Sequence, residues 1–163
     1  MEHTVEARAK LLGHPVHPML VCFPLGLLGT SVVFDVAHLI ADSPRFAEVA
    51  FWMIASGVPA GLLAALFGIV DWLAIPRGTR AWGIGFLHGV SNAVVLVLFA
   101  ASALVRADAP AEPGAWALAL SLLGVVLAAV AGWLGGELVN RLGVGVHDGA
   151  NLDAPSSLRG RPL

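Results

Sequence analysis

The sequence predicts an all-α integral membrane protein, built as an up-down-up-down bundle of four helices. Four apolar stretches are each long enough to cross the hydrocarbon layer of a bilayer, which takes about 20 residues. The composition agrees, because 58% of the residues are hydrophobic, 12% are charged and the mean hydropathy is +0.84, which leaves too little polar surface for a soluble globule. Short polar connections separate the stretches, so consecutive helices are expected to pack antiparallel.

The four expected helices cover about residues 18–41, 47–73, 81–105 and 115–142. Proline and glycine interrupt helices, and they mark all three connections. The helices are expected to form one transmembrane domain over residues 1–147, which a flexible C-terminal tail follows over residues 148–163. The marker residues of the connections are Pro44, Pro76, Gly78, Pro110 and Pro113.

The distribution of basic residues predicts the orientation of the bundle. Cytoplasmic loops of membrane proteins carry an excess of Lys and Arg. Here the excess falls on the side of the two termini and the second connection, whereas the other side has only Arg45 and Arg106. Both termini are therefore expected in the cytoplasm, with the helices in a bacterial inner membrane. The basic residues on the side of the termini are Arg8, Lys10, Arg77, Arg80, Arg141, Arg159 and Arg161.

Several classes of function have no support in the sequence. The net charge is −2 and Lys and Arg never form a run, which argues against nucleic acid as a partner. Cys22 is the only cysteine, so an intrachain disulfide, a thiolate zinc cage and a four-cysteine iron–sulfur cluster are excluded. Neither a P-loop nor a dinucleotide fingerprint nor a nucleophile motif is present. Four helices alone offer little room for the alternating access of a transporter.

Two histidines precede the first helix, in the segment GHPVHPMLVCFP. His14 and His17 each stand before a proline, which fixes its own φ and pushes the preceding residue out of the helical region. Both rings are therefore expected in an extended or turned segment, with Pro18 in the first position of the helix. Rings held in this way lose little entropy on binding a metal or a cofactor. The alternative interpretation is that they are polar groups at the level of the lipid headgroups.

His88 is the strongest single candidate for a functional residue. It lies within an apolar helix, where ionisable side chains usually face the protein interior and mark a functional site. Asn92 is four residues later and therefore on the same helix face. Gly85 and Gly89 bracket His88 and allow a second helix or a flat macrocycle to approach. Ordinary helix packing, with His88 satisfied by Asn92 or by a backbone carbonyl, is the alternative.

Two carboxylates fall at the same end of the expected bundle as these histidines. Asp71 and Glu137 are candidate metal ligands. Salt bridges of Asp71 with Arg77 or Arg80, and of Glu137 with Arg141 four residues later, are the favoured interpretation.

Asp35 and His38 belong to a different neighbourhood, because they lie at the opposite end of the first helix. At 1.5 Å per residue they are about 25 Å from His17. A proton-handling pair and a membrane anchor are both open for them, and the anchor is favoured.

A faint internal duplication relates the first two helices to the last two. Each half begins with a histidine-bearing segment and ends with a tryptophan motif, at Trp72 and Trp133, and a repeat of this kind has its axis along the membrane normal. The first and third helices are then diagonal neighbours, which places His14 or His17 opposite His88. That arrangement suits the two axial ligands of a b-type haem. It equally suits one transition-metal ion held by imidazoles and a carboxylate.

The chain resembles a family of small uncharacterised bacterial membrane proteins that have four helices and a GHPxHPxLVxFP-like opening motif, here Gly13 to Pro24. The likeness extends to the segment from Asp71 to Gly78, to His88 and Asn92, and to the segment from Gly132 to Val146. The resemblance implies a domain of unknown function. Some relatives are joined to Rieske-type iron–sulfur domains, which points to membrane electron transfer. No such domain falls within these 163 residues, so an electron partner is expected to be a separate protein.

Three functions are therefore open. The first is a membrane redox protein that binds a b-type haem between the opening motif and His88. The second is a non-haem metal protein that uses the same histidines and a carboxylate. The third is an accessory subunit of a larger membrane complex, in which the polar groups only lock the helices together. Membrane lipid is a partner in every case, and association into a homo-oligomer is left open. The candidate site residues are His14, His17, His88, Asn92, Asp71 and Glu137.

Overall fold

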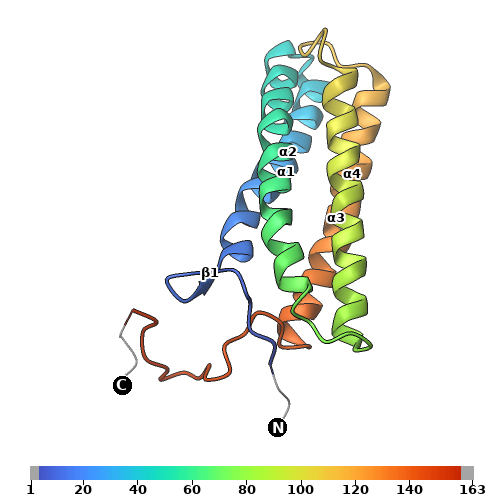
Figure 1. Cartoon of the computed structure of the whole chain (residues 1–163). Coiled ribbons are helices and arrows are strands. Elements are labelled where there is room, and N and C mark those ends of the chain that lie inside the picture. Colours follow the sequence, from blue (N-terminus) through green and yellow to red (C-terminus); the bar gives the residue numbers. More distant parts are fainter. Residues whose placement is uncertain (1–3, 159–163) are drawn as a thin grey trace.

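The computed structural model describes residues 4–158, which form four long helices and a minimal two-stranded sheet. The helices are α1 (Val16–Ala41), α2 (Pro44–Trp72), α3 (Arg80–Val105) and α4 (Ala115–Asn140). They run up, down, up and down, and the two chain ends lie at the same end of the bundle (Figure 1). We call this the terminal end and the opposite one the distal end. Each helix is long and apolar enough to cross a membrane, so the predicted fold class is confirmed.

The helix ends follow local chemistry. α2 begins with Pro44, at a position where a missing N–H costs no hydrogen bond within the helix. α3 begins after Thr79, whose hydroxyl accepts a hydrogen bond from the amide of Trp82 at 3.1 Å and caps the helix. α1 ends where Asp42 adopts a left-handed φ of 48°, a conformation that Asp tolerates better than most residues. The helix bounds lie within a few residues of the predicted ranges.

α1 begins earlier than predicted, so the two histidines of the opening motif lie in different elements. His17 is part of the first helical turn, and Pro18 follows it within that turn. Proline is tolerated there because the first N–H groups of a helix have no partner within it. His14 instead belongs to β2 (His14–Pro15), which pairs antiparallel with β1 (Lys10–Leu11). The prediction that both rings share one extended segment is therefore wrong.

The N-terminal segment and the chain after α4 lie together at the terminal end. Val5 pairs with Val144 in a parallel bridge. Residues 148–158 form turns and coil without helix or strand. Residues 159–163 of the predicted tail, with two of the basic residues counted above, lie outside the described residues. The flexibility of the tail stays a prediction.

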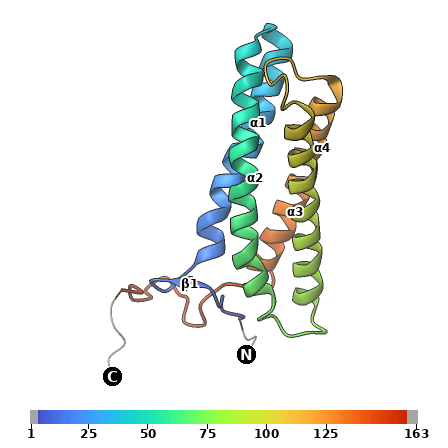
Figure 2. The ribbon, with the colours of Figure 1, turned by 45° about the horizontal axis from the view of Figure 1, so that its top comes forward.

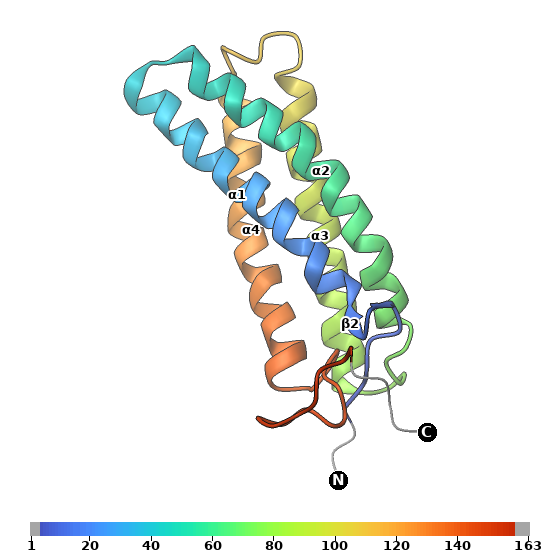
Figure 3. The same cartoon turned by 90° about the vertical axis from the view of Figure 1, so that its left-hand side faces the viewer.

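The bundle is made of two hairpins. α1 packs most extensively against α2, and α3 against α4, and the two pairs stand side by side in Figure 2. In Figure 3 the first hairpin crosses the second at an angle. Large apolar side chains cover the outside of the helices, as expected for a surface that faces lipid. The buried core between the hairpins consists of Leu28, Val32, Ile54, Val95 and Phe99.

An internal repeat relates the two hairpins. The side chain of Leu28 of α1 packs directly against Gly57 of α2, and that of Phe99 of α3 packs in the same way against Gly124 of α4. Residues of α1 and α3 that are 71 positions apart are equivalent, and a second constant offset relates α2 to α4. The equivalent pairs used below are His17/His88, Ser31/Ser102, Asp35/Arg106, Ala50/Ala117, Ile54/Ser121, Ala64/Ala131 and Gly68/Gly135.

The repeat has a different register from the predicted one. The sequence suggested that Trp72 corresponds to Trp133. The packing of the histidine rings makes Gly68 equivalent to Gly135. In that register the residue equivalent to Trp72 is Val139 and not Trp133. The predicted duplication of a helical hairpin is therefore correct, and the alignment of its tryptophans is wrong.

Candidate functional site

His17 of α1 and His88 of α3 lie next to each other toward the terminal end of the bundle. The centroids of their imidazole rings are 6.5 Å apart, and the ring planes are nearly perpendicular, at 89°. α1 and α3 are diagonal in the bundle, since each packs mainly against α2 and α4. Because the two histidines are equivalent in the internal repeat, their pair lies on the axis that relates the hairpins. The structure thus brings His17, but not His14, to His88.

One backbone carbonyl orients each ring. Nδ1 of His17 lies 2.8 Å from the carbonyl oxygen of Ala64, and Nδ1 of His88 lies 2.9 Å from that of Ala131. A carbonyl oxygen only accepts hydrogen bonds, so Nδ1 of each neutral ring carries the hydrogen and Nε2 keeps its lone pair. The same arrangement is typical of metal-ligating histidines, whose other ring N–H donates to a carbonyl or a carboxylate.

Two glycines provide the space that the rings occupy. A Cβ atom at Gly68 would lie 2.9 Å from Cε1 of His17, and one at Gly135 would lie 3.0 Å from Cε1 of His88. Ala64 and Ala131, whose carbonyl oxygens accept the hydrogen bonds from the rings, have small side chains as well. The rings therefore pack against small residues of α2 and α4 at these four positions.

The glycines that flank His88 in sequence have another role or none in packing. A Cβ atom at Gly85 would lie 2.6 Å from Cδ1 of Trp72, and nothing lies within 4 Å of such an atom at Gly89. Nε1 of Trp72 donates to the carbonyl of Trp82 at 3.1 Å. Gly85 therefore admits an indole that closes the α2–α3 connection, and not a partner of the His88 ring.

Asn92 lies beside His88, as its spacing predicts. Its side-chain nitrogen donates to the backbone carbonyl of His88 at 2.9 Å and lies almost equally far from the two nitrogens of the ring, 3.4 Å from Nδ1 and 3.3 Å from Nε2. Asn92 therefore packs beside the ring and is directed at the backbone carbonyl, not at the lone pair of Nε2.

His14 lies outside the pair. It is exposed, and its Nε2 is 3.2 Å from the hydroxyl of Ser157. Within residues 4–158 no three His, Cys, Asp or Glu side chains are arranged to hold a metal ion. The expected cage of three imidazoles and a carboxylate is not assembled in this part of the chain.

The two candidate carboxylates have partners that the sequence did not indicate. Oδ1 of Asp71 accepts hydrogen bonds from the backbone amides of Arg8 and Ala9 at 2.8 and 3.0 Å. Oε1 of Glu137 accepts from Arg80 at 2.6 Å. The favoured salt bridges are therefore wrong: the N-terminal segment folds under the bundle and offers free amides to Asp71, and Glu137 takes the arginine that was expected for Asp71.

A buried ion pair at the distal end was missed by the sequence reasoning. Asp35 of α1 is 3% exposed and Arg106 after α3 is 2% exposed, and they form two hydrogen bonds of 2.7 and 3.1 Å. Ser121 donates to Oδ2 of Asp35 at 2.7 Å, and Arg106 also donates to Oγ of Ser102 at 2.9 Å. The network joins the two hairpins on their common axis.

The expected roles of Asp35 and Arg106 are both corrected. Asp35 forms an ion pair with Arg106 of the other hairpin and is not a membrane anchor. Arg106 is buried and is not an exposed loop residue. Nδ1 of His38 lies 3.0 Å from the carbonyl oxygen of Ser43, just after α1, and a role of His38 as an anchor stays a prediction. The signal that indicates the pair is the repeat, because Asp35 and Arg106 are separated by the same 71 residues as the two core histidines.

Four apolar helices with polar residues on their common axis define the class: a small integral membrane protein made of two duplicated hairpins. The family described as "Predicted membrane protein (DUF2231)" matches residues 13–148, and the chain belongs to this family. The match includes both core histidines and the buried ion pair. Neither a curated protein nor a solved structure matches the chain.

Proposed function

We propose that the protein is a membrane electron-transfer protein that binds a b-type haem between His17 and His88. The proposal rests on one observation. Two imidazoles from opposite helices meet in the bundle, each with Nδ1 bonded to a carbonyl and with Nε2 left to act as a ligand.

The spacing of the rings supports ligation on opposite sides of one iron. A metal–imidazole bond is about 2 Å long and the ring centroid lies about 1 Å beyond the nitrogen, so two such rings have centroids about 6 Å apart. Two neighbouring ligands of a tetrahedral ion have centroids about 5 Å apart. The observed 6.5 Å is closer to the first value. Perpendicular ring planes are compatible with it, because each ring rotates freely about the metal–nitrogen axis.

A bound haem supplies reversible one-electron chemistry, with a potential that depends on the axial ligands and their hydrogen bonds. The chain contributes the orientation of those ligands. The carbonyls of Ala64 and Ala131 hold the rings and raise the basicity of Nε2. The small residues of α2 and α4 at this level let the rings pack closely against these helices, and the apolar helices exclude water.

The proposal includes an orientation and a partner. The basic terminal end lies in the cytoplasm of a bacterial cell, in line with the excess of Lys and Arg there. The histidine pair lies toward that end, so a separate redox protein docks there. The same site without haem, as a non-haem metal site completed by Asn92 or by other ligands, is an outcome of the test below.

The test is an absorption spectrum with elemental analysis of the detergent-purified protein, expressed with added haem precursor. The matched variants are His17→Ala, His88→Ala and His38→Ala, since His38 also bonds to a backbone carbonyl but lies at the distal end. We expect a Soret band in the parent and in His38→Ala and its loss in the other two. Stoichiometric metal without a Soret band supports the non-haem alternative. A parent with neither haem nor metal contradicts both and leaves the accessory role.

A further inference from the structure

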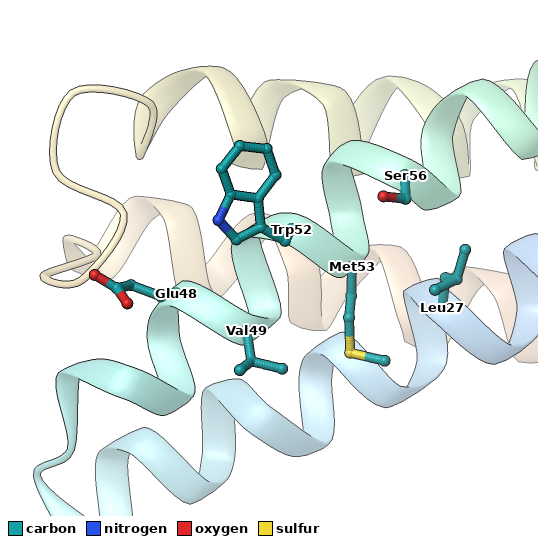
Figure 4. Close-up of a pocket in the computed structure, with 6 residues that line it drawn as sticks. All are labelled: Leu27, Glu48, Val49, Trp52, Met53 and Ser56. Carbon is teal, nitrogen blue, oxygen red and sulfur yellow. The ribbon is translucent and has the colours of Figure 1, made fainter.

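A groove with a volume of about 390 Å³ lies on the outside of the first hairpin, toward the distal end. It lies mainly on one face of α2, with Leu27 contributed by α1, and Figure 4 shows a carboxylate at one end and an indole, a thioether, aliphatic side chains and a hydroxyl group along the rest. The surface is on the outside of a transmembrane bundle, where lipid is the available ligand. The groove is lined by Leu27, Glu48, Val49, Trp52, Met53 and Ser56.

The polar and apolar parts of the groove are arranged by depth. Glu48 lies in the second turn of α2, close to the distal end, and is exposed. Trp52 follows one turn deeper and is 66% exposed. Tryptophan is enriched at the boundary between headgroups and hydrocarbon, which places Glu48 at the level of the headgroups. Met53 and Leu27 then line the part that contains hydrocarbon.

The carboxylate of Glu48 is available to a ligand. The ion pairs among residues 4–158 do not include Glu48. Near the N-terminus of α2 its negative charge is also stabilised by the helix dipole. A carboxylate in this position attracts a cationic headgroup and repels an anionic one.

The carboxylate of the groove is specific to the first hairpin, whereas the second hairpin has an exposed indole nearby, because Trp116 corresponds to Val49 of the groove. In the internal repeat Glu48 corresponds to Ala115 and Trp52 to Ala119. The second hairpin therefore packs in the same way with neither a carboxylate nor an indole at these positions, and hairpin packing does not require them.

We propose that this groove binds a phospholipid with a primary ammonium headgroup. The ammonium group pairs with Glu48, the glycerol region lies against the indole of Trp52, and one acyl chain follows Met53 and Leu27. This proposal does not depend on the haem site, which lies on the bundle axis toward the other end.

Native mass spectrometry of the full-length protein in detergent tests the proposal. The probe is an equimolar mixture of phosphatidylethanolamine and phosphatidylglycerol with identical acyl chains. We expect the ethanolamine adduct to exceed the glycerol adduct by up to about fivefold, the upper end of the range of an exposed ion pair. Glu48→Gln should bring the ratio close to one, and Trp52→Leu should reduce the adducts of both lipids.

The matched control is Glu112→Gln, which removes an exposed carboxylate of the distal end outside the groove and should leave the ratio unchanged. The double substitution Ala115→Glu with Ala119→Trp should add a second ethanolamine adduct on the other hairpin. Equal binding of the two lipids by the parent, or an unchanged preference in Glu48→Gln, overturns the proposal in favour of unspecific annular lipid. A dimer that Trp52→Leu abolishes overturns it in favour of a second copy of the chain.

Discussion

The two hairpins of the bundle pack in the same way, but the side chains on their common axis differ between the two ends of the bundle. Toward the terminal end the equivalent residues are identical, His17 and His88, and each ring bonds to a carbonyl of its own hairpin. At the distal end they are opposite in charge, Asp35 and Arg106, and they bond across the hairpins. Identical side chains on an axis make a symmetric site that a shared ligand can bridge. Opposite charges there stabilise the pairing of the hairpins.

The different ends of α1 and α3 explain how the ion pair is built. α1 continues past Asp35 to Ala41, whereas α3 ends at Val105, immediately before Arg106. The long side chain of Arg106 turns back into the bundle from the end of its helix. Its charged group therefore reaches a depth that the short Asp35 reaches from within a helix.

Breaking the ion pair should have the largest effect on stability. Asp35→Ala leaves the guanidinium of Arg106 buried without a counter-charge, which costs about 3–5 kcal/mol. Unfolding in mixed dodecylmaltoside and SDS micelles measures this loss. The double variant Asp35→Leu with Arg106→Met should lose much less, because no buried charge remains. A single variant as stable as the parent contradicts the burial of the pair.

Exchanging the two charges tests whether the positions of Asp35 and Arg106 are interchangeable between the two hairpins. Asp35→Arg combined with Arg106→Asp should recover more than half of the loss of the single variant. The arginine introduced at position 35 meets Ser31 and the carbonyl of Ala50, the equivalents of the partners that Arg106 has in Ser102 and Ala117. The same micelle titration reads the recovery. If the exchange is no better than the single variants, an arginine is accommodated only at the end of α3 and not within α1.

The exchanged protein should still be less stable than the parent by about 1 kcal/mol, the contribution of one hydrogen bond. Ser121 donates to Asp35, and its equivalent in the first hairpin is Ile54, which has no donor. Adding Ile54→Ser to the exchanged protein should restore that bond. In the parent the same substitution should destabilise, because Ile54 is fully buried in the core.

Substitutions of the two glycines that pack against the histidine rings test the equivalence of the hairpins toward the terminal end. Gly68→Ala and Gly135→Ala should each cost about 1–3 kcal/mol, since the added methyl group overlaps an imidazole ring. Equivalence predicts similar losses for the two. Gly132→Ala is the control on α4, because nothing lies within 4 Å of the added atom. Unequal losses at the two glycines indicate that only one histidine is seated as described.

The smallest effect is expected at the ion pair of the terminal end. Arg80→Ala removes the partner of Glu137, but the Arg80 side chain is 58% exposed, so the loss should stay below about 1 kcal/mol and shrink with added salt. The micelle titration at low and high salt measures it. A loss as large as that of Asp35→Ala would mean that the contribution of an ion pair to the stability of this protein does not depend on its exposure.

The fold was largely predictable from the sequence, and the partners of polar residues were not. An apolar stretch of about 20 residues indicates a helix that lies in the hydrocarbon of a bilayer, and this pattern located all four helices. His88 stood out because an imidazole within an apolar helix needs a partner. Arg106 did not, because it follows an apolar run and reads as the first residue of a loop. Asp71 was assigned to nearby arginines, whereas its amide donors lie more than 60 residues away in sequence.

The number of spans and their bounds to within a few residues follow from the amino-acid sequence, since they depend on composition and local backbone chemistry, and a faint repeat of motifs already indicated the duplicated hairpin. The contacts of His17 with His88 and of Asp35 with Arg106, and the groove on the outside of the first hairpin, follow only from the packing of the helices. Those outcomes depend on where α1 begins and on how the hairpins cross. Contacts across a bundle are set by the packing of whole helices, which no local pattern in the chain encodes.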